Sequence, residues 1–157
     1  MNETDYKLLD SQLRALLDGE TDALASASNF VALLYNAMDD VNWLGIYVLR
    51  DTGLVLGPFQ GLPACVHLLV GSGVCGTAAA TRETQRVADV HQFEGHIACD
   101  AESRSEIVVP LVQNGDLIGV LDIDSPTVDR FSALDQTGVE TLSATFCEFQ
   151  SARDQFI

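Results

Sequence analysis

The side chains of this chain best suited to nucleophilic or redox chemistry are those of its four cysteines, Cys65, Cys75, Cys99 and Cys147. Cys147 stands in an apolar helical stripe, where a cysteine behaves as a small hydrophobe. Cys65 precedes a predicted strand without a charged neighbour, which favours burial. Cys75 begins a short predicted helix whose N-terminus favours a thiolate, although a small residue filling a tight turn explains it equally well. Cys99 lies in a long polar loop near two histidines, and that context indicates a nucleophile.

Carboxylates at the ends of two predicted strands form a second candidate group. Asp122 and Asp124 end an otherwise apolar strand, and a side-chain period of two places both on one face. Acids there either serve a ligand or a cation, or mark the point where the strand reaches solvent. Glu106 begins the preceding strand, so the turn between the two strands decides which face it shares.

Two turn geometries place Glu106 on opposite faces of the sheet. A three-residue loop with Gly115 left-handed sets Glu106 opposite Asp122, whereas a two-residue turn at Asn114 and Gly115 sends Glu106 to the other face. We expect the three-residue loop, with Glu106, Asp122 and Asp124 lining one pocket together with Cys99.

No metal site is expected from the spacing of the cysteines and histidines. Structural zinc sites normally show short paired spacings such as C-x₂-C. Here ten positions separate Cys65 from Cys75 and twenty-four separate Cys75 from Cys99. The three histidines are interpreted as hydrogen-bonded loop and strand residues; they are His67, His91 and His96.

The overall charge excludes several classes of partner. The chain carries 23 acidic residues against 8 basic ones, a formal net charge of −15, and Lys7 is its only lysine. Nucleic acid and anionic membranes are recognised largely through lysine and arginine, so neither is an expected partner, whereas a ligand with a positive group suits this field. The N-terminal residues lack the features of a signal peptide, so we expect a cytoplasmic protein, in which four cysteines are not a structural disulfide framework.

Hydrophobic periodicity predicts helices first and strands after them. Gly19 ends a first helix, Thr21 caps a second, and Ser132 with Asp135 opens the last. The polar stretch Asp89–Ser105 predicts a long loop, which in a compact domain is usually functional. The order of elements indicates one α+β domain over residues 1–157 with a mostly antiparallel sheet flanked by helices. The expected helices are Glu3–Leu17, Leu24–Met38, Val74–Thr81 and Ser132–Phe149, and the expected strands are Trp43–Leu49, Leu54–Leu56, Val66–Val70, Ile107–Val112 and Leu117–Ile123.

Five segments resemble one known family, the free methionine-R-sulfoxide reductases, which are built on the GAF domain. The likeness runs from about residue 20 to about residue 148, and the motifs follow in the order and spacing of that family. The segments are NWLGIYVL, LVLGPFQGLPACVHL, GSGVCGTAAAT, VADVHQFEGHIACDAESRSEIVVPL and IGVLDIDSP.

The resemblance implies a GAF fold, with a central antiparallel sheet flanked by helices, in a protein that is usually a homodimer. It implies an oxidoreductase acting on a sulfur group with a disulfide as acceptor, which reduces free L-methionine (R)-S-oxide to L-methionine. Thioredoxin, which its reductase re-reduces with NADPH, is the implied electron donor, and no bound cofactor or metal is implied. The implied site residues are Cys99 as nucleophile, Cys65 as resolving cysteine and Cys75 as recycling thiol, with Trp43, Glu106, Asp122 and Asp124 in the substrate pocket.

Reduction of a sulfoxide requires residue types that this sequence contains. A sulfoxide sulfur becomes a good electrophile once its oxygen is protonated, so the reaction needs a thiolate and an acid. Cys99 would attack the sulfur, release methionine and remain as a sulfenic acid, with which Cys65 condenses. Crowded carboxylates keep one proton available, and the remaining charge binds the ammonium of a free amino acid. Any of the three acids can be the donor; Trp43 would contact the thioether methyl, and N–H groups at Gly73-Val74-Cys75 the substrate carboxylate.

A ligand-sensing GAF module that binds a cyclic nucleotide or a similar molecule without turnover is the alternative. Such sensors are normally joined to output domains, for which we expect no room in 157 residues. A phosphate ligand also calls for basic residues that are scarce here. A non-catalytic dimerisation domain is a third interpretation, and it leaves the cysteines at positions 65, 75 and 99 unexplained.

Overall fold

The helices and strands lie close to the ranges that the sequence predicts. The structure is a computed structural model, and it describes residues 1–96, 101–150 and 157. Its helices are α1 (Glu3–Leu17), α2 (Ala23–Ala37), α3 (Gly73–Thr81) and α4 (Ala133–Gln150), with a 3-10 turn η1 at Val90–Gln92. Its strands are β1 (Trp43–Arg50), β2 (Gly53–Gln60), β3 (His67–Leu68), β4 (Gln85–Val87), β5 (Ser105–Gln113) and β6 (Asp116–Ser125).

Three local predictions are corrected. Asp22 rather than Thr21 caps α2, because its carboxylate accepts the N–H of Ala25 at 2.8 Å. The strand predicted over Val66–Val70 is limited to β3, because the chain turns at Gly71 into α3. The short elements β4 and η1 were not predicted, and η1 lies inside the stretch expected to have no secondary structure.

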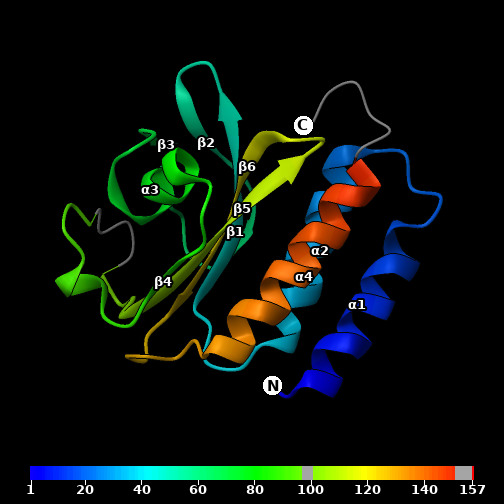
Figure 1. The fold of residues 1–157 in the computed structure, drawn as a ribbon, viewed down its shortest axis with the longest axis horizontal. Coiled ribbons are helices and arrows are strands. Elements are labelled where there is room, and N and C mark those ends of the chain that lie inside the picture. Colours follow the sequence, from blue (N-terminus) through cyan, green and yellow to red (C-terminus); the bar gives the residue numbers. More distant parts are fainter. Residues whose placement is uncertain (97–100, 151–156) are drawn as a thin grey trace.

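The strands form one antiparallel sheet of six, in the order β3-β2-β1-β6-β5-β4. Helices α2 and α4 cover one face of this sheet, and α1 packs against both of them (Figure 1). Helix α3 lies over the opposite face. The predicted α+β class with an antiparallel sheet is therefore confirmed.

No helix within the described residues is both long and apolar enough to cross a membrane.

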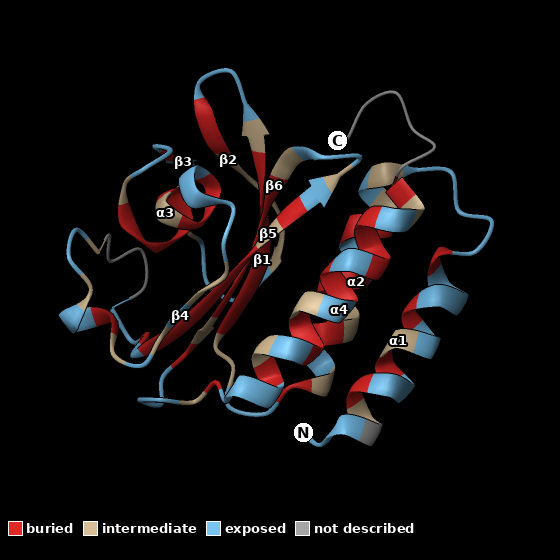
Figure 2. Ribbon diagram, viewed as in Figure 1, coloured by how far each residue is buried: buried red, intermediate tan, exposed pale blue. Residues whose placement is uncertain are grey.

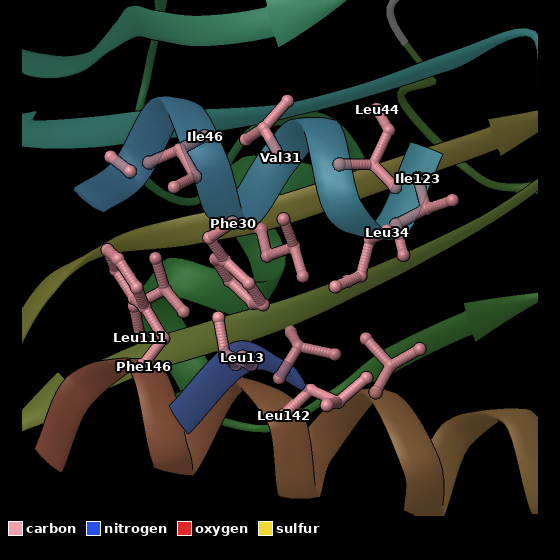
Figure 3. Close-up of a cluster of buried hydrophobic side chains, with 14 of the residues drawn as sticks. Leu13, Phe30, Val31, Leu34, Leu44, Ile46, Leu111, Ile123, Leu142 and Phe146 are labelled. Carbon is pink, nitrogen blue, oxygen red and sulfur yellow. The ribbon is translucent and has the colours of Figure 1, made fainter. Parts of the chain in front are cut away.

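The alternation of side chains along β1 separates two apolar layers. Leu44 and Ile46 join the core beneath α2 and α4, whereas Trp43 and Tyr47 point to the α3 side. The central strands are buried on both faces, and α2 and α4 turn their buried sides to the sheet (Figure 2). On that side Phe30 of α2 stacks on a phenylalanine of α4 (Figure 3). The smaller α3 layer is the one that leaves room for a site.

The β5–β6 hairpin turns through two residues rather than the three predicted. Gln113 pairs with Asp116, and the two residues between them, Asn114 and Gly115, have φ angles of +51° and +85°. Two positive φ angles are what a type I′ turn requires, and Asn-Gly is the preferred pair there. In an uninterrupted hairpin this turn would send Glu106 to the face opposite the acids of β6.

A β-bulge close to the turn reverses that outcome. Val112 pairs with Leu117 and Leu111 pairs with Gly119, so Ile118 is an extra residue of β6 without a partner in β5. One inserted residue shifts the register by one and exchanges the faces of all residues beyond it. A glycine follows the bulge because a Cβ on Gly119 would lie 2.3 Å from a carbonyl oxygen of β1.

The observed register puts the acids on one face in a different arrangement from the predicted one. Glu106 pairs with Asp124, not with Asp122, and Asp122 pairs with Val108. Glu106 and Asp122 are therefore diagonal neighbours. The predicted pairing was wrong because the turn residues do not reveal a bulge, which is fixed by how β6 packs between β1 and β5.

A buried hydrogen bond fastens α1 to the start of α4. The Tyr6 hydroxyl donates to Asp135 Oδ1 at 2.6 Å. The other carboxylate oxygen of Asp135 accepts the Ser132 N–H at 2.8 Å, and the Ser132 hydroxyl accepts the Asp135 N–H at 3.1 Å. This reciprocal pair is the capping box that the sequence predicts at Ser132.

Replacing Tyr6 by phenylalanine should lower the free energy of unfolding by about 1–3 kcal/mol, because the buried Asp135 loses a donor while the ring packing is kept. Chemical denaturation measures the change. Tyr35→Phe is the matched control, since Tyr35 is half-buried and its hydroxyl makes no hydrogen bond to the described part of the chain; it should change stability by less than about 0.5 kcal/mol. Equal small losses in both variants would contradict the role of the Tyr6 bond.

Candidate active site

A pocket opens on the α3 face, at the end of the sheet where β1 and β5 begin and β6 ends. Its polar lining includes Cys75, Glu106, Asp122 and Asp124, and Trp43 forms part of its apolar wall. The three carboxylates therefore share one pocket, and their predicted roles in substrate binding stay predictions. Cys99, which was expected to share the pocket, lies outside the described residues.

The innermost part of this pocket is a cluster of three acidic groups. Glu106 and Asp122 are each only 6% exposed, and Cys75 reaches them from the first turn of α3. The Cys75 Sγ and one carboxylate oxygen of each acid lie within 4.8 Å of one another. We call these three residues the acid–thiol cluster. No lysine or arginine is found among the described residues that line the pocket, so no permanently charged cation there balances the cluster.

Burial controls the protonation of the two carboxyl groups. Loss of solvent raises the pKa of Glu106 well above its ordinary value, and the negative charge of Asp122 raises it further. Burial also raises the pKa of Asp122, from 3.8 to about 6, while hydrogen bonds from Cys75 and Glu106 oppose that rise. The pair therefore holds a proton at neutral pH, with Glu106 as its more basic member.

The Cys75 thiol differs from its sequence-based interpretation. Its position in the first turn of α3 suggested a stabilised thiolate. Instead burial, followed by the charges of Asp122 and Glu106, raises the pKa of Cys75 well above its ordinary value. Desolvation and two neighbouring acids outweigh the helix terminus, so this thiol is protonated at neutral pH. Its predicted role as a recycling thiol stays a prediction.

Two aromatic side chains of β1 hold the segment that carries Cys65. The indole N–H of Trp43 donates to the Leu62 carbonyl at 3.0 Å, and the Tyr47 hydroxyl donates to the Cys65 carbonyl at 2.9 Å. The two rings also stack, with centroids 5.9 Å apart. Burial, then the charge of Asp122, raises the pKa of Tyr47, so its hydroxyl remains a donor. Sequence reasoning missed Tyr47, although its place four residues after Trp43 on one strand was a usable signal.

The three described cysteines differ in their bonding state. Cys65 is disulfide-bonded, whereas Cys75 and Cys147 carry free thiols. Cys147 belongs to the core on the helix side, as its apolar surroundings predict. The predicted pairing of Cys65 with Cys99 stays a prediction, because Cys99 is not among the described residues.

Two further groups line the pocket: His96, which the sequence predicts to be a hydrogen-bonded loop residue, and the start of α3, whose N–H groups are the predicted contact of a carboxylate. The His96 Nε2 atom lies 3.9 Å from Glu106 Oε2. Partial burial and then the nearby His91 lower the pKa of His96, so a neutral imidazole faces a protonated carboxyl. The start of α3 also lines the pocket at Gly73 and Val74, and the N-cap side chain of Ser72 makes no capping hydrogen bond. Backbone N–H groups at such a helix start favour an anion.

The chain resembles known proteins over almost its whole length. The family model of the GAF domain matches residues 12–147. A protein of Escherichia coli (strain K12) named free methionine-R-sulfoxide reductase is 54% identical over 145 residues, which cover 92% of this chain and 88% of that protein. A structure of free methionine-R-sulfoxide reductase from Neisseria meningitidis in complex with its substrate is 37% identical, with a TM-score of 0.91 over 97% of this chain and 93% of that one. A structure of fRMsr of Staphylococcus aureus in complex with substrate is 50% identical, with a TM-score of 0.89 over 95% of this chain and 97% of that one.

The raised pKa of Asp122 makes its contribution to the stability of the fold fall as the pH rises. Because the folded state binds this proton more tightly than the unfolded chain, the contribution of Asp122 to stability is fully present below about pH 4 and is lost as the pH rises through about 6. Asp122→Asn removes that loss, so the drop in unfolding free energy from pH 4.5 to pH 8 should shrink by an amount on the order of 1–3 kcal/mol. Denaturant titrations at the two pH values measure it.

The control for this experiment is Asp116→Asn, an exposed carboxyl at the start of the same strand. That variant should keep the pH dependence of the parent protein. Since an amide also alters hydrogen bonds, the comparison rests on the pH-dependent difference and not on absolute stability. An unchanged pH dependence in Asp122→Asn would contradict the burial argument.

Proposed function

This chain belongs to the free methionine-R-sulfoxide reductases, a family built on the GAF domain, and from that membership we propose that it reduces free methionine R-sulfoxide to methionine. The observation that carries the proposal is the acid–thiol cluster, in which two buried carboxyls face no lysine or arginine among the described lining residues. A free amino-acid sulfoxide needs a proton donor for its oxygen and an anion for its ammonium group. One buried acidic pocket supplies both.

The proton comes from the buried carboxyl pair. Glu106 is the donor we favour, because burial and the neighbouring Asp122 keep it protonated at neutral pH. Protonation of the sulfoxide oxygen makes the sulfur electrophilic. As negative charge appears on Glu106, the neutral His96 at 3.9 Å is placed to take a proton from solvent and offset that charge.

The redox steps use the cysteines that the family resemblance assigns. The Cys99 thiolate attacks the protonated sulfoxide; the substrate S–O bond breaks as the hydroxyl passes to the Cys99 sulfur, so methionine leaves as the thioether and Cys99 becomes a sulfenic acid. The Cys65 thiol then displaces that oxygen as water and forms a disulfide with Cys99. A dithiol of thioredoxin reduces this disulfide and is itself oxidised to a disulfide, which restores both thiols of the protein. We propose that the working protein is a cytoplasmic homodimer.

Recognition of a free amino acid follows from the charges around the pocket. The ammonium group contacts the carboxylates, with Asp124 at the edge of the cluster. The substrate carboxylate lies at the backbone N–H groups of Gly73 and Val74 at the start of α3. The indole of Trp43 contacts the S-methyl group. A methionine sulfoxide inside a peptide has no free ammonium group, so it would leave the carboxylates unpaired.

The alternative remains a GAF module that binds a ligand without turnover. An assay with thioredoxin, thioredoxin reductase and NADPH separates the two functions. The reductase consumes NADPH when free methionine sulfoxide is added, whereas a sensing module does not. Absence of NADPH consumption, with no methionine formed in a single turnover, would overturn the proposed function.

Two cysteine variants should separate the first turnover from recycling. Cys99→Ser removes the attacking atom, so no methionine should form even when the reduced protein is present in excess over sulfoxide. Cys65→Ser should still form one methionine per active site, and thioredoxin-driven turnover should fall by more than about tenfold because the sulfenic acid is not resolved. Quantifying methionine after a single turnover and NADPH consumption in steady state measures both effects.

Cys147→Ser is the matched control for these variants, since Cys147 is a free thiol buried in the core on the opposite face of the sheet. It should keep both the single turnover and the steady-state rate. An equal loss of the first turnover in Cys65→Ser and Cys99→Ser would show that the two roles are wrongly assigned.

N-acetylation of the substrate should reduce kcat/KM by roughly tenfold to a hundredfold. The acetylated sulfoxide presents a neutral amide to the carboxylates, and loss of a charge-assisted hydrogen bond costs about 1.5–3 kcal/mol. The measurement compares the free and the N-acetylated R-sulfoxide with the same protein preparation. Comparable kcat/KM values would mean that the acids are not the ammonium site.

A further inference from the structure

We propose that Cys75, Glu106 and Asp122 form a binding site for Zn²⁺, and that the ion inhibits the enzyme by occupying the substrate pocket. The binding rests on the geometry of the acid–thiol cluster and on a buried carboxylate oxygen of Asp122 that has no hydrogen-bond partner within the described structure. The inhibition rests in addition on the proposed reductase function. Nothing in the reaction requires the ion, so the site is regulatory and not catalytic.

The donor set selects the kind of ion. One thiolate sulfur and two carboxylate oxygens are ligands that Zn²⁺ accepts together. Mg²⁺ and Ca²⁺ prefer oxygen ligands, and Cu⁺ prefers sulfur, so neither class fits the mixed set. Three protein ligands leave the fourth tetrahedral position to water.

The distances require only a small closure. With Zn–S near 2.3 Å and Zn–O near 2.1 Å, tetrahedral ligands lie roughly 3.4–3.7 Å apart. The three donor atoms of Cys75, Glu106 and Asp122 already lie within 4.8 Å of one another. Side-chain shifts of about 1 Å therefore bring them into coordination. Two of the donors stand on paired strands and the third on the first turn of α3, so the backbone already supplies the convergence.

A second observation points to a missing positive ligand. Asp122 is only 6% exposed, and its Oδ1 atom has no hydrogen-bond partner in the described structure. A buried carboxylate oxygen without a partner is costly unless a cation or donor arrives. No lysine or arginine lines the pocket within the described residues, so the chain does not supply that cation from there.

Occupation by the ion excludes the substrate for two reasons. It uses the carboxylate oxygens of Glu106 and Asp122 that would hold the ammonium group or donate the proton. It also places positive charge where the substrate's own positive charge must go. Zinc and free methionine sulfoxide are therefore mutually exclusive ligands of one pocket.

The binding test uses the oxidised protein, in which Cys65 is disulfide-bonded and Cys75 is a free thiol. Zn²⁺ is titrated in competition with a chromophoric chelator. We expect one ion per chain, and at least a tenfold to hundredfold weaker affinity in Cys75→Ser and in Asp122→Asn, because loss of a direct ligand costs no less than loss of an outer-shell partner. Excess Mg²⁺ should not displace the zinc.

Cys147→Ser is the matched control and should bind zinc as the parent protein does, because its thiol lies in the core beyond the sheet. Co²⁺ gives a second readout that does not depend on variants. A thiolate-to-cobalt charge-transfer absorption in the parent protein supports coordination by sulfur, and its loss in Cys75→Ser assigns it. No zinc binding by the parent protein, or unchanged affinity in Cys75→Ser, would overturn the site.

The inhibition test measures methionine formed in a single turnover by the reduced parent protein. Zinc should suppress it, a chelator should restore it, and more sulfoxide should raise the zinc concentration needed for half inhibition. Inhibition that does not respond to sulfoxide concentration would refute competition for the pocket. A protein that reduces sulfoxide but binds no zinc overturns this inference and leaves the proposed function standing. One that binds zinc but never forms methionine overturns the proposed function and, with it, the inhibition, and leaves the zinc site standing.

Discussion

Two carboxyl groups buried side by side are the constraint on which the site depends. Glu106 and Asp122 stand on adjacent strands, and both side chains are buried in the pocket beneath α3. Like charges at diagonal positions repel, and low polarity strengthens that repulsion. Only a proton or a cation relieves it. The same repulsion explains the retained proton, and it underlies the proposed binding of an ammonium group and of a zinc ion.

The rest of the fold keeps that arrangement from relaxing. On the far side of the sheet, α2 and α4 pack on the alternate residues of the same strands, and Phe30 stacks on Phe146 with ring centroids 4.7 Å apart. On the near side, Trp43 and Tyr47 hold the backbone around Cys65 by two hydrogen bonds. The large core thus lies on the helix side of the sheet, and the small layer beneath α3 contains the candidate site.

The proposed proton donation and the proposed ion binding use the same carboxyl groups, which limits the ligands that suit the pocket. A ligand that enters must bring positive charge or accept a proton, since the described lining offers three carboxylates and no lysine or arginine. The N–H groups at the start of α3 favour an anion a short distance away. A zwitterionic amino acid whose side chain takes up a proton meets these demands together, whereas a phosphate ligand meets only one of them.

The sequence by itself determined the local features. The α1 helix, the capping box at Ser132 and the acidic end of β6 follow from neighbouring residues, because propensity, capping and side-chain period act over a few positions. The resemblance of five sequence segments to one family predicted the family as well. Tertiary structure alone decided the contacts between distant strands: the bulge at Ile118 reversed the face of Glu106, and packing under α3 raised the pKa of Cys75 against its helix position. Register and desolvation depend on what lies across the sheet, which no local pattern records.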